Sequence, residues 1–145
     1  MLENMQVLKV SDADTIVVTK KPRINFKYKK QKGDLIVRLQ GIDAPETKQK
    51  WGTACAHMLR KKLLNKRVNI LEEGRDKYGR VLGRVRFNGI DINRELVRQG
   101  CAWAYVGFDD SYIEDEKHAR TFKLGLWRDK KQVPPWLWRQ RNKGR

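Results

Sequence analysis

Short segments in which polar and apolar residues alternate recur along the chain and predict β-strands. The alternation covers residues 67–72 and again residues 81–87, where an Asn88-Gly89 turn follows. A period of two places the apolar side chains on one face of a sheet, as in a half-buried strand. Three more segments, rich in β-branched and other apolar residues, come earlier in the chain; they are residues 6–10, 15–19 and 35–39. The pattern therefore predicts five short strands.

Apolar residues at helical spacing predict three helices. They recur every three to four positions over residues 52–64, and Asn65 ends that pattern. Two further helices are predicted over about residues 93–99, ended by Gly100, and over about residues 111–123. Five strands with a helix between the third and the fourth predict an α+β fold: a five-stranded OB-fold β-barrel with three α-helices.

The length of the chain limits its organisation. At 145 residues it can enclose one hydrophobic core but not two ordinary ones. We therefore expect a single domain over residues 1–145, with its core at about residues 7–127. Residues 128–145 form a basic tail that contains Trp residues. We expect this tail to pack on the body through its indole rings, or else to act as an arm that stacks on bases.

The charge of the chain indicates a polyanionic partner. Lys and Arg total 33 against 17 Asp and Glu, a formal net charge of +16. Such an excess attracts nucleic acid and releases its counterions on binding. The Lys-rich residues 20–32 are expected to form an exposed hairpin loop, which is either a solvated loop or a direct substrate contact. Because no apolar run approaches the roughly 20 residues that span a bilayer, we expect no membrane attachment.

Two clusters of acidic and basic residues carry the candidate chemistry. One runs from Arg38 to Thr47 as Arg-Leu-Gln-Gly-Ile-Asp-Ala-Pro-Glu-Thr, and the other is Asp76-Lys77-Tyr78-Gly79-Arg80. Asp12 and Asp14 lie upstream, at the turn of the first predicted hairpin. Carboxylate oxygens suit a hard divalent cation, Arg suits phosphate oxygens, and a carboxylate without a metal can direct a water. The combination indicates metal-assisted cleavage of a phosphate ester.

On these residues the chain resembles the thermonuclease family, which is named for staphylococcal nuclease. The likeness runs from about Val7 to Trp127 through four motifs in order. They are Asp-x-Asp-Thr at 12–15, Arg-Leu-x-Gly-Ile-Asp-Ala-Pro-Glu at 38–46, Asp-Lys-Tyr-Gly-Arg at 76–80 and Asn-x-x-Leu-Val-Arg-Gln-Gly at 93–100. The resemblance implies an OB-type barrel with three helices. It also implies calcium-dependent hydrolysis of DNA and RNA to products that end in 3'-phosphate.

The resemblance assigns a set of metal ligands residue by residue. It implies that Asp14 and Asp43 bind Ca²⁺ through their side chains and that Ala44 does so through its backbone carbonyl. The founding member has Thr at the position of Ala44, but a carbonyl ligand survives that change. Asp12 is then a neighbouring carboxylate outside the ligand set.

The resemblance also assigns the groups that act on the substrate. Arg38 and Arg80 would clamp the scissile phosphate, and Glu46 would hold or deprotonate the attacking water. The remaining substrate contacts are Lys77 and Tyr78 at a neighbouring phosphate and Tyr105 beside the nucleotide.

Two hypotheses follow. The first is a calcium-dependent phosphodiesterase, an endonuclease or exonuclease with little sequence specificity. The second is a noncatalytic nucleic-acid-binding module on the same barrel. The presence of Asp14, Asp43 and Glu46 favours the enzyme, because a pure binder gains nothing from carboxylates that face a polyanion. We expect a monomer that prefers single strands, whose splayed bases offer their faces to aromatic residues.

The compartment stays open at this level. Cys55 and Cys101 permit one disulfide but equally fit two buried thiols, and their spacing is unlike a zinc site. The segment Met1–Met5 contains an acidic residue, and no apolar segment of a secretory signal follows it. We expect a cytoplasmic protein if this is the full native chain, and a secreted or periplasmic one if a signal peptide has been removed. The danger of an indiscriminate nuclease to its own cell favours export.

Overall fold

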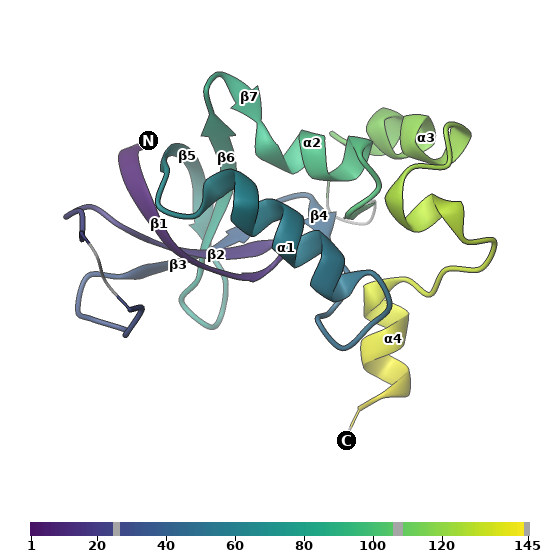
Figure 1. Ribbon diagram of the computed structural model, residues 1–145, viewed down its shortest axis with the longest axis horizontal. Coiled ribbons are helices and arrows are strands. Elements are labelled where there is room, and N and C mark those ends of the chain that lie inside the picture. The colour runs from purple at the N-terminus through teal and green to yellow at the C-terminus, as the bar shows by residue number, and fades with distance from the viewer. Residues whose placement is uncertain (25–26, 106–108, 144–145) are drawn as a thin grey trace.

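A closed five-stranded β-barrel forms the main body of the molecule and lies toward one end of its long axis (Figure 1). The computed structural model describes residues 1–24, 27–105 and 109–143. The barrel strands are β1 (Leu2–Asp12), β2 (Thr15–Thr19), β3 (Leu35–Leu39), β5 (Arg67–Arg75) and β6 (Val81–Phe87). They pair in the order β3-β2-β1-β5-β6 through antiparallel neighbours. A parallel pairing of β3 with β6 then closes the barrel.

Three two-residue strands lie outside the barrel itself. β7 (Ile90–Asp91) adds to the outer edge of β6. β4 (Ile42–Asp43) and β8 (Trp103–Ala104) form a separate antiparallel pair, in which Asp43 lies opposite Trp103. This small pair fixes the segment after β3 against the segment that leads to Tyr105.

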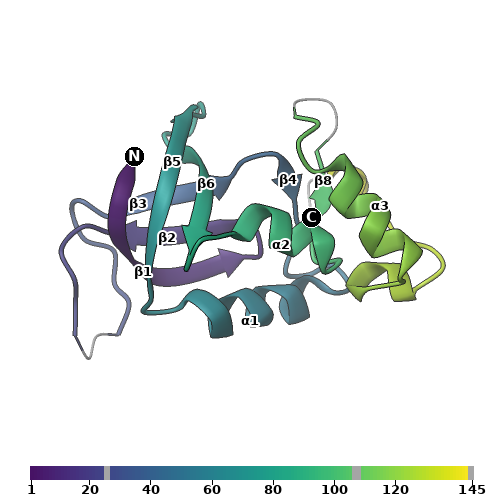
Figure 2. The ribbon, with the colours of Figure 1, turned by 90° about the horizontal axis from the view of Figure 1, so that it is seen from above.

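Helices cover one side and one end of the barrel. α1 (Gly52–Leu63) packs against β1, and α2 (Ile92–Arg98) packs against β6 and against α3 (Ile113–Thr121). In Figure 2, α1 runs along the barrel, whereas α2 and α3 lie together toward the end that holds β4 and β8. The chain ends with a 3-10 helix, η1 (Gly125–Arg128), and with α4 (Pro135–Arg141).

The predicted α+β OB-fold class is confirmed, with elements that the sequence pattern did not show. β1 and β5 are longer than predicted, and β4, β7 and β8 are too short to produce an alternation. The residues that the structure describes contain four α-helices instead of three, because α4 lies in the predicted tail. Pro135 is the first residue of α4, where its fixed φ angle suits the helix and its missing N–H is not needed.

One hydrophobic core fills the barrel and continues under α1 and α2. Cys55, Leu59 and Leu63 of α1 are buried at a spacing of four residues, which confirms the predicted amphipathic helix. The barrel contributes buried side chains from every strand; examples are Val7, Ile16, Val37, Ile70 and Val85. The barrel is therefore a packed core that holds the ends of its strands at fixed positions.

A disulfide joins two of the covering helical segments. Cys55 of α1 and Cys101, just after α2, form this bond across a sequence separation of 46 residues. Both residues are buried. Of the two alternatives that the sequence allowed, the structure has the disulfide.

A buried polar network ties β6 to the residues before α3. Arg84 Nη1 donates to the hydroxyl of Tyr112 at 2.7 Å, and that hydroxyl donates to Asp91 Oδ2 at 3.3 Å. Arg84 also forms an ion pair with Asp109. Burial, followed by the charge of Asp91, raises the pKa of Tyr112 to about 12.

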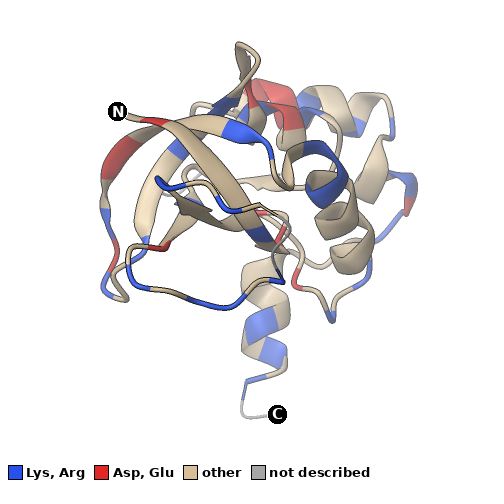
Figure 3. Cartoon of the chain, turned by 60° about the vertical axis from the view of Figure 1, so that its left-hand side comes forward, with Lys and Arg blue, Asp and Glu red and all other residues tan. Residues whose placement is uncertain are grey.

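The Lys-rich residues 20–32 form part of the long connection between β2 and β3. Its base is fixed to the barrel, because Arg23 pairs with Asp34 at 2.5 Å and the backbone N–H of Arg23 donates to Gln6 Oε1 at 2.7 Å. Figure 3 brings this side forward and shows Lys and Arg along the connection. Within the described ranges, no helix combines the length and the apolar character needed to cross a membrane.

Candidate active site

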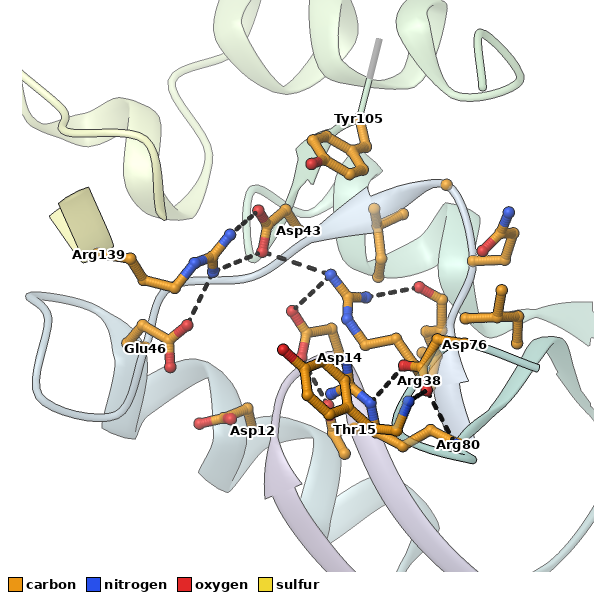
Figure 4. Close-up of a pocket in the computed structure, with 16 residues that line it drawn as sticks. Asp12, Asp14, Thr15, Arg38, Asp43, Glu46, Asp76, Arg80, Tyr105 and Arg139 are labelled. Carbon is orange, nitrogen blue, oxygen red and sulfur yellow. Dashed lines mark hydrogen bonds and ion pairs between the residues drawn. The ribbon is translucent and has the colours of Figure 1, made fainter. Parts of the chain in front are cut away.

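A cavity of about 520 Å³ opens at the end of the barrel where β2 begins and β3 ends (Figure 4). It collects most of the site residues predicted from the sequence. Those that line it are Asp12, Asp14, Arg38, Asp43, Glu46, Tyr78, Arg80 and Tyr105. Ala44 and Lys77 are not among its lining residues. The fold thus brings residues from four separate segments of the chain to one opening.

Asp14, Arg38 and Asp43 form the centre of this cavity. Asp14 directly precedes β2. Its neighbour Thr15 pairs with Arg38 of β3, and this pairing brings Asp14 close to Arg38. Nη2 of Arg38 lies 3.5 Å from Asp14 Oδ2 and 3.4 Å from Asp43 Oδ1. The backbone N–H of Ala44 donates to Asp14 Oδ2 at 2.8 Å, so Asp14 also holds the start of the following loop. Two nearly buried carboxylates therefore converge on one guanidinium nitrogen.

Glu46 lies on the loop between β4 and α1, which packs tightly against the start of that helix. Its backbone N–H lies 3.3 Å from Gln49 Oε1, a side-chain acceptor within the same loop. A Cβ atom at Gly52 would lie 1.7 Å from the carbonyl oxygen of Glu46, so only glycine allows this close approach. The position of the Glu46 backbone is therefore coupled to α1.

Arg80 enters the cavity from the loop between β5 and β6. Asp76 organises that loop: its Oδ1 accepts the backbone N–H groups of Tyr78 at 2.9 Å and Arg80 at 3.0 Å. Asp76 Oδ2 accepts from Arg80 Nε at 2.7 Å, which orients the guanidinium. The Tyr78 ring is 73% exposed and lies 5.6 Å from the Arg80 guanidinium. Lys77 Nζ lies 5.2 Å from the centre of the same ring, outside the cavity lining.

Arg139 of α4 is the residue of this cavity that sequence reasoning missed. Its Nη2 lies 2.8 Å from Asp43 Oδ2, and its Nη1 donates to Glu46 Oε1 at 2.8 Å (Figure 4). Arg139 is separated from Asp43 by 96 positions, and no local motif surrounds it. The only signal was the recurrence of Arg among the Trp residues of the tail. Asp76 was recognised as part of a motif, but its role in orienting Tyr78 and Arg80 was not predicted.

The environment of two carboxylates shifts their pKa values. Burial raises the pKa of Asp43, although the hydrogen bonds and the charge of Arg139 oppose that shift. Burial also raises the pKa of Asp12 to about 6, with further contributions from the negative charges of Asp14 and Glu46. Burial and the neighbouring negative charges therefore disfavour the ionised form of these carboxylates. Nearby cations favour the ionised form.

Aromatic side chains border the cavity beside Asp43. Tyr105 stacks on Trp136 of α4, with ring centres 6.0 Å apart and planes at 29°. Trp136 also meets Trp103 edge to face at 5.6 Å. The tail packs on the body through Trp136, as the first of the two sequence alternatives expected, although Trp136 stays 40% exposed.

The predicted metal ligands supply oxygen donors, the chemical type that calcium prefers. Among the residues with a described placement, no group of three or more His, Cys, Asp and Glu side chains is arranged to hold a metal. The predicted set needs only two carboxylates, Asp14 and Asp43, and takes a third oxygen from the Ala44 backbone. The two carboxylates converge on Arg38, and hard oxygen donors with irregular geometry are what calcium accepts. The ligand roles of these residues stay predictions.

A basic OB-fold barrel that gathers carboxylates and three guanidinium groups in one cavity has the equipment of a phosphodiester-cleaving enzyme. The family model described as "Staphylococcal nuclease homologue" matches residues 36–129. The chain belongs to this family, which confirms the resemblance seen in its motifs. It is accordingly a hydrolase of the nuclease class.

Individual relatives extend the match over nearly the whole chain. An "Uncharacterized endonuclease" of Escherichia coli is 36% identical over 139 residues, which cover 94% of this chain and 84% of the relative. An "Uncharacterized endonuclease" of Haemophilus influenzae is 34% identical over 95% of this chain and 74% of the relative. A "Micrococcal nuclease" of Shigella flexneri is 34% identical over 95% of this chain and 81% of the relative.

Proposed function

We propose that the protein is a calcium-dependent phosphodiesterase that cleaves DNA and RNA with little sequence specificity and leaves 3'-phosphate ends. One observation carries the proposal: Arg38 and Arg80 line the same cavity as Asp14, Asp43 and Glu46. The net charge of +16 supports nucleic acid as the substrate. Family membership supports the type of reaction.

The two arginines act on the phosphate. When the phosphorus becomes five-coordinate, negative charge grows on its non-bridging oxygens. Donors that are already in position stabilise this state more than the ground state. The carboxylates that contact Arg38 and Arg80 fix both guanidinium groups before substrate binds. A bound calcium ion would add positive charge beside the same oxygens.

Glu46 acts on the water. Its carboxylate would accept a hydrogen bond from the attacking water and orient it toward the phosphorus. The water oxygen bonds to phosphorus and the bond between phosphorus and the 5' oxygen breaks. The 5' oxygen leaves and takes up a proton to become a hydroxyl, and the phosphate stays on the 3' oxygen of the upstream nucleotide.

The substrate contacts extend beyond the scissile phosphate. Tyr78 and Lys77 would hold a neighbouring phosphate, and Tyr105 would lie beside the nucleotide. The exposed lysines of the β2–β3 connection would contact the backbone farther from the cut. Aromatic rings at the cavity favour single strands, whose bases are free to stack.

The proposal extends to the compartment. We propose that the protein is exported after removal of a signal peptide, to the periplasm or the medium. The disulfide between Cys55 and Cys101 supports this, because such bonds persist mainly in oxidising compartments.

The test measures turnover on single-stranded DNA and RNA with calcium or with a chelator. Glu46→Gln and Arg80→Lys are expected to reduce kcat by about 10²-fold or more. Arg86→Gln removes an exposed charge from β6 and is the matched control, expected to retain its rate. Unfolding curves verify that each variant is folded.

Two outcomes would contradict the proposal. Near-normal rates in both site variants would refute the assigned roles, and full activity after removal of divalent ions would refute the metal dependence. Tight DNA binding without turnover by the native chain would favour the noncatalytic alternative. The ends of the products, identified by mass spectrometry, show on which side of the cut the phosphate remains.

A further inference from the structure

The guanidinium of Arg139 occupies the position that a cation would need in order to reach Asp43. Nη2 contacts Asp43 Oδ2 at 2.8 Å, and Nη1 contacts Asp43 Oδ1 at 3.2 Å. Arg38 approaches Asp43 Oδ1 from the other side at 3.4 Å. Both oxygens of this carboxylate therefore already accept hydrogen bonds from cationic groups.

The same guanidinium joins Asp43 to Glu46, through its 2.8 Å contact with Glu46 Oε1. The side chain of Asp43 is 1% exposed and that of Glu46 is 31% exposed. A buried carboxylate without a partner is strongly unfavourable, so Asp43 requires a nearby cation. The carboxylate arrangement is thus stable with Arg139 in place, independently of any bound ion.

Specific contacts hold α4 over the cavity. Trp136, three residues before Arg139, stacks on Tyr105 and meets Trp103 edge to face. The segment before α4 is fixed as well, because Gln49 of the Glu46 loop donates to the carbonyl of Val133. Arg139 is therefore delivered to the carboxylates by a docked element rather than by a free tail.

We propose that Arg139 is a built-in competitor of the divalent cation in this site. Arg139 and calcium compete for Asp43, because Arg139 contacts both of its carboxylate oxygens and thereby covers the atoms that the ion needs. Calcium must therefore displace the guanidinium, and α4 sets the calcium concentration at which the site fills. This inference rests on the proposed calcium dependence and adds to it a residue that lowers the apparent affinity.

The test measures calcium binding by isothermal titration calorimetry on chelator-treated protein, without substrate. Arg139→Gln is expected to bind calcium at least about tenfold more tightly than the native chain. Arg141→Gln removes the same charge from an exposed position of the same helix, and its dissociation constant is expected to stay within about twofold of the native value. Arg139→Lys keeps the charge without the paired donors and is expected to lie between the native chain and Arg139→Gln.

A second readout is thermal stability, which does not depend on activity. Without calcium, Arg139→Gln is expected to have a lower Tm than the native chain, because Asp43 loses its principal partner. Calcium is then expected to raise the Tm of this variant more than that of the native chain. A variant that regains stability with calcium is folded around an intact site.

Each alternative result overturns the inference. Equal or weaker calcium binding by Arg139→Gln would show that Arg139 supports the site instead of competing for it. An equal gain in Arg141→Gln would reduce the effect to net charge. If all variants bind calcium with one affinity, only this inference fails. If neither the native chain nor any variant binds calcium, the proposed calcium dependence fails with it.

Discussion

Loss of the disulfide between Cys55 and Cys101 is expected to destabilise the protein by about 4 kcal/mol. The bond closes a loop between residues 46 positions apart. Chain-entropy theory gives an entropy loss in the unfolded state of about 13 cal/mol/K for such a loop, which corresponds to about 4 kcal/mol at 25 °C. For a chain of this size that difference lowers the Tm by roughly 10 °C.

The assay is equilibrium unfolding in urea of three species: the oxidised native chain, the reduced native chain and the double variant Cys55→Ala with Cys101→Ala. Reduction removes the crosslink while both buried sulfur atoms stay in the core. The double variant also removes their packing, so it is expected to be the least stable of the three. The oxidised chain is expected to have the smallest m-value, because its crosslinked unfolded state is more compact.

One result would refute this reasoning. If the oxidised and reduced native chains unfold at the same urea concentration with the same m-value, the crosslink does not constrain the unfolded state. A loss confined to the double variant would attribute the effect to packing of the sulfur atoms instead.

Two further predictions concern alkaline stability and DNA binding. The pKa of Tyr112 is about 12 in the folded state and 10 in the unfolded state, so between about pH 9 and pH 11 mainly the unfolded state releases this proton. The native chain is therefore expected to lose about 1 kcal/mol of unfolding free energy over this pH range. Tyr112→Phe should remove that part of the decline in urea unfolding curves, and equal declines would contradict it. The affinity for duplex DNA, measured with chelator present, falls with salt concentration along a log–log line. Replacing three exposed lysines of the β2–β3 connection by Gln is expected to reduce the magnitude of that slope by about 0.9 for each phosphate that the variant no longer neutralises. The lysines replaced in the connection are Lys27, Lys29 and Lys30. The control variant replaces three exposed lysines elsewhere, Lys61, Lys66 and Lys123, and is expected to change the slope less. Equal slopes for the two triple variants would contradict a role for the loop.

Elements with a regular pattern could be predicted from the sequence. The strands at Thr15–Thr19 and Leu35–Leu39 are observed where apolar, β-branched runs indicated them, and the helix that begins at Gly52 is observed where helical spacing did. All residues of β2 are buried and α1 buries one face against the core, so their apolar content and spacing record their structure directly. The gathering of Asp14, Arg38 and Asp43 was also expected, because the resemblance to the thermonuclease family assigns all three to one site.

Other parts have no such record in the sequence. β4 and β8 contain two residues each, and their pairing joins segments that lie far apart in the chain. The contact of Arg139 with Asp43 arises from tertiary packing of α4, and nothing near Arg139 in the chain distinguishes it from other surface cations. Long-range pairs of this kind follow from the fold and could not be predicted from local pattern alone.

The parallel pairing of β3 with β6 has a consequence for how the enzyme matures. It sets Arg38 opposite Leu82, two positions after Arg80, and these strands come from distant parts of the chain. Pairings between such distant segments form late, because loop closure must precede them. On the proposed roles of Arg38 and Arg80, we therefore expect a folding chain to form local hairpins before it has a complete phosphate clamp. We expect nuclease activity to begin only when the whole barrel has formed.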